Sequence, residues 1–483
     1  MCPTGTGRYA LGLLAALSLA LLSMAVDMFG FSVVVAGCAC DLRLDHAQKS
    51  LLISTPFVGP IIMSYIWGYV SDTQGRRWSL LVGLWGGFLV SILSAFSTHW
   101  VVLAVLKIIG TSFSSCAQSG TFTYLGESCP ERVRGTYSLV MTSALMLFIL
   151  AYDVPAYFIL NLNFTYDWGI ITFTPWRLLT LVIAAPLGIS ALMLHFFCES
   201  PKFLINAGKE NQALEHLKTM WRRNGNSGIY PVTKVVLNEE STLRSKQKFL
   251  LASLFDQVLP LFKPPLLWRT LQLFYLTAVI YAINNGLVMW MPIIVEAFTA
   301  GLESPGAGPA SLCDIIVTYH ANYTQNYDTA ACISSIDTRT LISGVAHGLI
   351  FSTVTLLISR LGRRRKLLMI AFLCLPLVCS VAAVYNENSV ASLVLYVGTI
   401  STNFCMGFLF GYYVDLYPTS YRGMAACLGV MVSRLAGLAG VHFLGALVMS
   451  HCRLTFLAFA IYLFSGVLMA YFLPPDISYN KRS

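Results

Sequence analysis

The chain has 483 residues, of which 56% are hydrophobic and only 11% charged, and its mean hydropathy is +0.69. A soluble domain carries about 25% charged residues, so this composition excludes that class together with disordered, collagen-like and disulfide-rich secreted chains. What remains is a polytopic membrane protein, which needs apolar runs of about 20 residues. The net charge of +9 does not indicate binding to nucleic acid, because the cations gather in the loops predicted to be cytoplasmic.

Such apolar runs recur along the chain and predict an all-α polytopic membrane protein with twelve transmembrane helices. The first has an alternative, a signal peptide cleaved after Ser23-Met24-Ala25, but its apolar character continues through Val35, which is too long for a signal sequence. The predicted spans are residues 9–36, 50–71, 78–97, 100–126, 136–160, 176–197, 268–297, 339–358, 367–385, 389–413, 423–447 and 453–473.

Lysine and arginine set the expected orientation, because cytoplasmic loops of membrane proteins are enriched in both. With both termini cytoplasmic, most cations fall inside, and the two Asn-x-Thr glycosylation sequons, at Asn163 and Asn322, fall outside. The predicted organisation is an N-terminal six-helix half (1–197), a cytoplasmic linker (198–267), a C-terminal six-helix half (268–473) with an outer loop (298–338), and a cytoplasmic tail (474–483).

Two motifs of the first half recur in the second. Gly75-Arg76-Arg77 matches Gly362-Arg363-Arg364, and the pattern Tyr-x-x-Glu/Asp-x-x-Pro-x-x-x-Arg-Gly spans 124–135 and again 412–423. The two repeats keep nearly the same offset, which predicts two six-helix halves in parallel repeat. Transporters of this architecture bind their solute between the halves, near the middle of the membrane.

These motifs also resemble those of a known family. GYVSDTQGRR (68–77) resembles the loop signature of the major facilitator superfamily, and Glu199-Ser200-Pro201-Lys202 resembles the sugar-porter signature, with Lys where Arg is usual. The stretch 199–218 and the repeated Glu/Asp motif resemble the synaptic vesicle glycoprotein 2 family and its transporter-like relatives. The resemblance implies a major facilitator fold. That vesicle family has a longer N-terminal segment and a larger loop between spans 7 and 8, so its partner and ligand roles are not carried over.

Charged residues at the cytoplasmic helix ends are candidates for a gating network. Carboxylates that pair with arginines in one conformation and separate in the other bias a two-state equilibrium. The alternative is that these charges only set the topology. The residues are Asp72, Arg76, Arg77, Glu127, Arg134 and Glu199 in the first half, and Arg363, Arg364, Asp415 and Arg422 in the second.

Ionisable residues within the spans are the candidates for a solute or ion site, because a charge in hydrocarbon costs about 2.5–3.5 kcal/mol or more. Asp27 is either a site for a cation or proton or one half of a structural ion pair, and it is a candidate partner for Arg434 of span 11. Lys107 lies where the superfamily often has Arg. Span 7 offers Tyr281, Asn284, Asn285 and Trp290, and its adjacent amides, Gly286 and Pro292 suggest a locally broken helix. Trp290 either stacks a ligand or belongs to an aromatic belt.

Cys313 and Cys332 share the outer loop and are expected to form a disulfide. No residue spacing indicates a metal site or an enzyme's active site, and no cofactor is expected. The leading hypothesis is a monomeric secondary transporter of a small organic solute in the plasma or vesicle membrane, with proton or ion coupling left open. The alternative is a non-transporting membrane protein of the vesicle type, with a regulatory or binding role.

Overall fold

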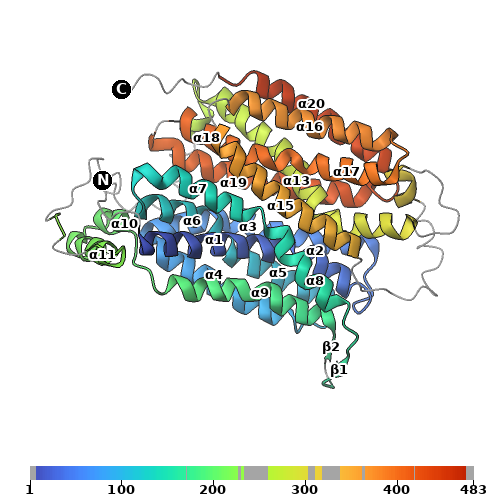
Figure 1. Ribbon diagram of the computed structural model, residues 1–483, viewed down its shortest axis with the longest axis horizontal. Coiled ribbons are helices and arrows are strands. Elements are labelled where there is room, and N and C mark those ends of the chain that lie inside the picture. The colour runs from blue at the N-terminus through green and yellow to red at the C-terminus, as the bar shows by residue number, and fades with distance from the viewer. Residues whose placement is uncertain are drawn as a thin grey trace.

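The computed structural model describes residues 7–169, 171–226, 230–232, 259–302, 311–317, 338–361, 365–417 and 419–474. These residues form a helical bundle with a single small hairpin (Figure 1). The blue-to-green helices of the first half lie beside the yellow-to-red helices of the second, with the helix axes roughly parallel.

The described residues of the first half form nine helices and the hairpin. They are α1 (Arg8–Phe29), α2 (Phe31–Cys38), α3 (His46–Gln74), α4 (Arg76–Ser94), α5 (Trp100–Ser114), α6 (Cys116–Ser128), α7 (Glu131–Leu145), α8 (Phe148–Leu160) and α9 (Pro175–Leu194), with β1 (Tyr166–Asp167) paired antiparallel to β2 (Thr172–Phe173).

The linker and the second half follow in the described residues. The linker elements are α10 (Pro201–Asn206), α11 (Glu210–Arg223) and η2 (Leu259–Phe262). The second half consists of α13 (Leu267–Leu302), α15 (Thr338–Leu361), α16 (Arg365–Tyr385), α17 (Ser389–Thr399), η3 (Ile400–Phe404), α18 (Cys405–Leu416), α19 (Thr419–Leu447) and α20 (Cys452–Tyr471).

The helices account for the twelve predicted crossings. In the described part of the chain, eleven helical segments are long and apolar enough to cross a membrane by themselves, and the twelfth is α15, whose apolar part is Leu341–Leu357. Several crossings are built from consecutive helices: α1 with α2, α5 with α6, α7 with α8, and α17 with η3 and α18. The expected all-α, twelve-helix architecture is confirmed.

The prediction of a broken span 7 is wrong. α13 runs without interruption through Asn284, Asn285 and Pro292. The two amides bond to each other through their side chains, Nδ2 of Asn284 to Oδ1 of Asn285 at 3.3 Å, and a long transmembrane helix tolerates the missing donor of one proline. The interruptions fall elsewhere, for example at Gly30 between α1 and α2, where an added Cβ would lie 2.9 Å from the Cβ of Tyr152.

The bundle has two distinct ends. α10, α11 and the start of α1 lie at one, which we call the linker end, and β1 and β2 lie at the other, the hairpin end (Figure 1). The linker end is the predicted cytoplasmic side. Asn163, the first sequon asparagine, is exposed beside the hairpin, and the second, Asn322, lies outside the described residues.

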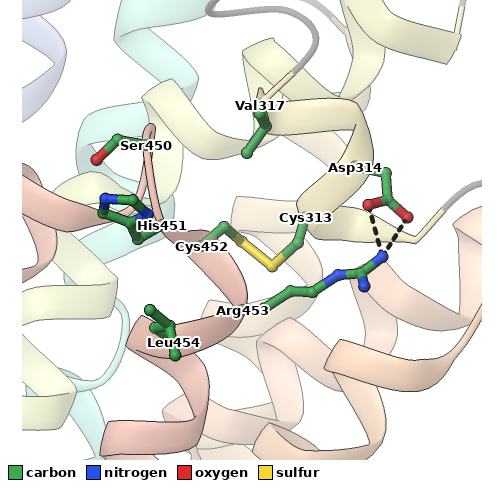
Figure 2. A pocket seen from close by; sticks show the side chains of 8 residues that line it. All are labelled: Cys313, Asp314, Val317, Ser450, His451, Cys452, Arg453 and Leu454. Atoms are coloured by element: carbon green, nitrogen blue, oxygen red, sulfur yellow. Dashed lines mark hydrogen bonds and ion pairs between the residues drawn. A yellow bond between two sulfur atoms is a disulfide. The ribbon is translucent and has the colours of Figure 1, made fainter.

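The predicted Cys313–Cys332 disulfide is wrong, because Cys313 is bonded to Cys452 at the start of α20 (Figure 2). Cys332 lies outside the described residues. The two bonded cysteines are 139 residues apart, so tertiary packing brings them together and shared membership of a loop does not predict the pairing. Beside them Arg453 Nη2 lies 2.7 Å from Asp314 Oδ1, on the edge of a cavity of about 330 Å³. Cys40, which follows α2, is also disulfide-bonded.

The halves meet along two seams. In one, α3 packs against α19, and in the other α7 and α8 pack against α15. Hydroxyl pairs bridge the second seam, Ser143 to Ser352 at 2.8 Å and Tyr157 to Thr338 at 3.1 Å. Any movement of one half against the other must break or slide these contacts.

Candidate functional site

A buried ion pair lies in the middle of the first half. Nζ of Lys107 on α5 is 2.7 Å from Oδ1 of Asp27 on α1, and the two side chains are 5% and 1% exposed. Nζ also donates to the main-chain oxygen of Asp27 at 2.6 Å. Two opposite charges removed from water together are tolerated only with close geometry and further hydrogen bonds.

Those further bonds are present. Ser91 on α4 donates to Oδ1 of Asp27 at 2.9 Å and Ser114 to Oδ2 at 3.5 Å. The Lys107 ammonium also lies 5.0 Å from the centre of the Phe31 ring, within the range of a cation–π interaction. The described contacts of Asp27 thus tie α1 to α4 and α5, as the structural ion-pair interpretation requires.

Arg434 on α19 does not pair with Asp27 in this conformation. Its Nη1 contacts the sulfur of Met28 at 3.1 Å, and its Nη2 donates to Oε1 of Gln118 on α6. The second half therefore reaches across to the first, one residue from Asp27. The Asp27 carboxylate pairs with Lys107 instead, because both residues lie within the same half and packing holds them together.

The guanidinium of Arg434 is only partly satisfied. The residue is 3% exposed, and its Nε has no hydrogen-bond partner among the described residues. Tyr281 on α13 lies beside it. Among the described residues no carboxylate forms an ion pair with Arg434, so this part of the bundle holds one positive charge more than Asp27 balances.

The side-chain amides of Asn284 and Asn285 on α13 form a polar cluster with Arg434 and Tyr281. Asn285 faces Gly437, one turn from Arg434 on α19: a Cβ added at Gly437 would lie 2.4 Å from Nδ2 of Asn285 and 3.1 Å from Cε1 of Phe57 on α3. Both asparagines are buried, and Oδ1 of Asn284 and Nδ2 of Asn285 have no described partner. Arg434 and the two amides therefore offer unfilled donors and an acceptor where the halves meet, and Tyr281 lies beside Arg434.

Trp290 lies away from this cluster. Its indole N–H donates to the main-chain oxygen of Val441 at 3.1 Å, and the side chain is 1% exposed. Gly445 makes room for the ring, because an added Cβ there would lie 2.4 Å from Cζ2 of Trp290. Trp290 therefore packs α13 against α19. It is not an exposed residue of an aromatic belt, and it is not among the described contacts of Arg434.

The linker end of the first half contains a second group of charges. Nη2 of Arg76 lies 3.1 Å from Oε1 of Glu127, Nε lies 3.2 Å from Oε2, and Nη1 contacts Asp72. The arginine fork thus holds the ends of α3 and α6 at the start of α4. Ser200 adds a bond from its hydroxyl to Oε2 of Glu127.

Glu199 holds the start of α4 in another way. Its carboxylate accepts from the main-chain N–H groups of Arg77 and Trp78, at 2.9 and 3.3 Å, where a negative charge stabilises a helix N-terminus. The Arg77 side chain donates to the carbonyl of Leu194 at 3.1 Å and to that of His195 at 2.9 Å. The structure thereby brings five of the predicted gating residues together.

The remaining gating candidates are not described at the side-chain level. Arg363 and Arg364 lie outside the described residues, and the side chains of Arg134, Asp415 and Arg422 are not placed. In the described part of the chain, no three His, Cys, Asp or Glu side chains gather as a metal site requires.

Sequence reasoning missed the uncharged members of the central cluster. Gln118, Ser91 and Ser114 carry contacts to Arg434 or Asp27. Of these three residues, only Gln118 can be identified from the sequence, because an amide side chain in the middle of an apolar span is uncommon. Serines are common in transmembrane helices and do not stand out.

Comparisons with known proteins agree with this architecture. Residues 15–441 match the family model of the Major Facilitator Superfamily. The synaptic vesicle 2-related protein of Rattus norvegicus is 25% identical over 88% of this chain and 71% of its own length. The organic cation/carnitine transporter 7 of Arabidopsis thaliana is 24% identical over 90% and 85%.

Solved structures show the same fold. The inward-open xylose transporter of E. coli superimposes with a TM-score of 0.66 at 16% identity, covering 98% of each chain. The arabinose-proton symporter of Bacillus subtilis is a further relative, 30% identical over 47% of this chain and 48% of its own. The chain is thus a multi-pass membrane protein that belongs to the Major Facilitator Superfamily.

Proposed function

We propose that this protein is a secondary transporter that carries a small organic solute with an anionic group, such as a carboxylate, by alternating access. The observation that supports this most directly is the Arg434 guanidinium, which is buried between the halves with an unfilled Nε and no described carboxylate partner. A buried charge that lacks a counter-ion is costly. A solute carboxylate would supply that counter-ion and accept two parallel bonds from the fork.

The neighbouring groups fit a polar solute. The free Nδ2 of Asn285 would donate to it and the free Oδ1 of Asn284 would accept from it. Asp27 is already neutralised by Lys107, so an anion would not meet an unpaired carboxylate there. A zwitterion fits the same site if its cationic part lies away from Arg434.

The coupling ion and the membrane belong to the same proposal. The relatives include an arabinose-proton symporter and an organic cation/carnitine transporter, which supports coupled transport of a small solute. The linker end is proposed to face the cytoplasm, because disulfides persist in oxidising compartments and Cys313–Cys452 lies at the other end. Synaptic vesicle 2-related proteins among the relatives support a vesicle membrane.

Uptake into proteoliposomes tests the proposal. Purified protein would be given radiolabelled organic anions, zwitterions, cations and sugars, with and without an inward pH gradient. We expect uptake of a carboxylate-bearing solute and its loss in Arg434→Gln. Arg453→Gln is the matched control, because it removes an arginine that is largely exposed at the hairpin end.

Each other outcome is informative. Uptake only of cations or sugars, undiminished in Arg434→Gln, would contradict the assignment of an anionic solute and keep the transporter. No uptake of any solute by correctly inserted protein would favour the non-transporting alternative. A pH gradient that leaves the rate unchanged would remove proton coupling from the proposal.

A further inference from the structure

Asp153 on α8 lies in the α8–α15 seam, and a second ionisable side chain, His347, lies on α15 three residues from Gly344, which contacts Asp153. Both are apart from the described contacts of Arg434. Asp153 on α8 is 2% exposed, and its Oδ1 has no hydrogen-bond partner among the described residues. Its Oδ2 occupies the space beside Gly344, because a Cβ added to this glycine would lie 1.8 Å away. The carboxyl group of one half is therefore pressed against the backbone of the other.

His347 lies one turn further along α15 and is equally buried. It is 1% exposed, and neither ring nitrogen has a hydrogen-bond partner among the described residues. Its ring stacks on Phe351, with 3.9 Å between the ring centroids and 13° between the planes. The imidazole thus has an apolar neighbour where a charged form would need a polar one.

The seam is closed on both sides of this pair. Toward the hairpin end Tyr157 contacts Thr338 at 3.1 Å, and toward the linker end Ser143 contacts Ser352 at 2.8 Å. Gly348 packs on Leu150 in between, since an added Cβ would lie 3.1 Å from the leucine Cβ. Asp153 and His347 are therefore enclosed by contacts that must separate when the halves part.

The packed elements offer few charges to balance this pair. No ion pair joins Asp153 or His347 to another described side chain, and from Gly344 to Ser359 the sequence of α15 has His347 as its sole ionisable residue. The elements packed against α8 and α15 carry other titratable or charged groups. Each is a tyrosine or cysteine, a residue that interacts with another charged side chain, or a residue near a helix end. They are Tyr152 and Tyr157 on α8, Arg8, Tyr9 and Asp27 on α1, Cys38 on α2, Arg177 on α9, Arg269, Tyr275, Tyr281 and Glu296 on α13, Glu131, Arg132, Arg134 and Tyr137 on α7, and Arg339 and Arg360 on α15.

We propose that Asp153 and His347 form a proton-binding site that controls whether the α8–α15 seam opens. The seam closes with both groups neutral, because an ionised carboxylate or imidazolium would be buried there without a counter-charge. When the seam opens toward the hairpin end, water reaches both groups, the carboxyl proton leaves to solvent and the carboxylate is hydrated. This inference rests on the proposed alternating access, but its test needs no solute.

The proton count fixes the sign of the pH dependence. Hydrated carboxyl and imidazole groups titrate near pH ~4 and ~6.5. Above pH ~6.5 the open seam binds no proton and the closed seam binds one, so closure is favoured as pH falls. Between pH ~4 and ~6.5 the open seam holds one proton on the imidazole and the closed seam one on the carboxyl. Closure is then nearly independent of pH.

The inference is tested directly by the distance between two labels across the seam, because the distance distribution gives the populations of the closed and open states. Spin labels attached to p-acetylphenylalanine at Phe158 and Ile342 would leave all cysteines intact, and both positions are exposed, at 64% and 61%. Double electron–electron resonance in nanodiscs would be recorded from pH 5 to 8. We expect the ratio of closed to open populations to fall about tenfold per pH unit between pH 7 and 8, and to change little between pH 5 and 6.

Two variants separate the groups. In Asp153→Asn the response above pH 7 disappears, and below pH 6.5 the closed population falls as pH is lowered, because only the imidazole then titrates. In His347→Gln the closed population keeps rising down to pH 5. Glu387→Gln is the control, since it removes an exposed carboxyl in the turn between α16 and α17 and should leave the parent profile unchanged.

A closed-to-open ratio that is constant from pH 5 to 8 would overturn the inference, and so would a parental profile retained in Asp153→Asn. If Asp153→Asn does not fold, His347→Gln still tests the inference. A closed population that does not keep rising down to pH 5 in that variant would contradict it. A failed solute assay with an intact pH response would contradict the proposed function and leave the proton site standing.

Discussion

Nζ of Lys107 lies 2.7 Å from Oδ1 of Asp27, and neither side chain is more than 5% exposed. The pair joins two crossings of one half, whereas Arg434 arrives from the other half and contacts the adjacent Met28. A neutral pair beside an unpaired cation produces a site with excess positive charge. This relationship links the packing of the first half to the solute class proposed for the whole protein.

The buried pair predicts an asymmetric response to mutation. Lys107→Met leaves Asp27 charged and unpaired, and we expect a loss of about 3–5 kcal/mol in the free energy of unfolding. The double variant Asp27→Asn, Lys107→Met removes both charges and should recover much of that loss. Denaturant unfolding in detergent, followed by tryptophan fluorescence, measures both. A double variant as unstable as the single one would show that the charges themselves are not responsible.

A small residue where the halves meet is predicted to be essential. Gly437→Ala puts a Cβ 2.4 Å from Nδ2 of Asn285 and 3.1 Å from Cε1 of Phe57, so the Asn285 amide and the Phe57 ring must shift from their places beside α19. We expect uptake to fall at least several-fold and the melting temperature to drop. Gly407→Ala in α18 is the matched control, because no atom lies within 4 Å of its added Cβ. Equal effects of the two substitutions would contradict this assignment.

The sequence predicted the crossings and most charged members of the sites, because a charge in an apolar run stands out by itself. Asp27, Lys107 and Arg434 were found in this way. Their pairing was not, since whether Asp27 binds Lys107 or Arg434 depends on which helices pack together. For the same reason Cys313 was paired within its loop, although its partner lies 139 residues away. The residue types of span 7 do not distinguish a broken helix from a continuous one, because residues that accompany broken helices are also accommodated in continuous helices.

The fork of Arg76 predicts a difference between arginine and lysine at the linker end. Nε and Nη2 bind Glu127 while Nη1 reaches Ser71 at 3.2 Å and Asp72. A lysine ammonium cannot span these partners with one geometry. We expect Arg76→Lys to lower the melting temperature and the uptake rate, with Lys209→Arg in the linker as a neutral control. Wild-type values for both properties would mean that Arg76 only sets the topology.

The contact between Asp314 and Arg453 predicts how the disulfide Cys313–Cys452 responds to acid. A hydrogen bond from Ser311, and then the bond and charge of Arg453, lower the pKa of Asp314 below its ordinary value. A lowered pKa means that the carboxylate stabilises this segment above pH ~3.9 and that the stabilisation is lost as pH falls through the lowered value. The phosphine TCEP reduces disulfides in acid, so its rate reports access to the bond.

We expect non-reducing peptide mapping to recover the Cys313–Cys452 pair. The reduction rate, relative to a small-molecule disulfide, should be constant between pH 7 and ~4 and rise in stronger acid. In Asp314→Asn the relative rate should already be high at pH 7, because the carboxylate that holds Arg453 is absent. Glu387→Gln, an exposed acid in the turn between α16 and α17, should behave like the wild type. A relative rate in Asp314→Asn that equals the wild-type rate at pH 7 would show that the Arg453 contact does not protect the disulfide.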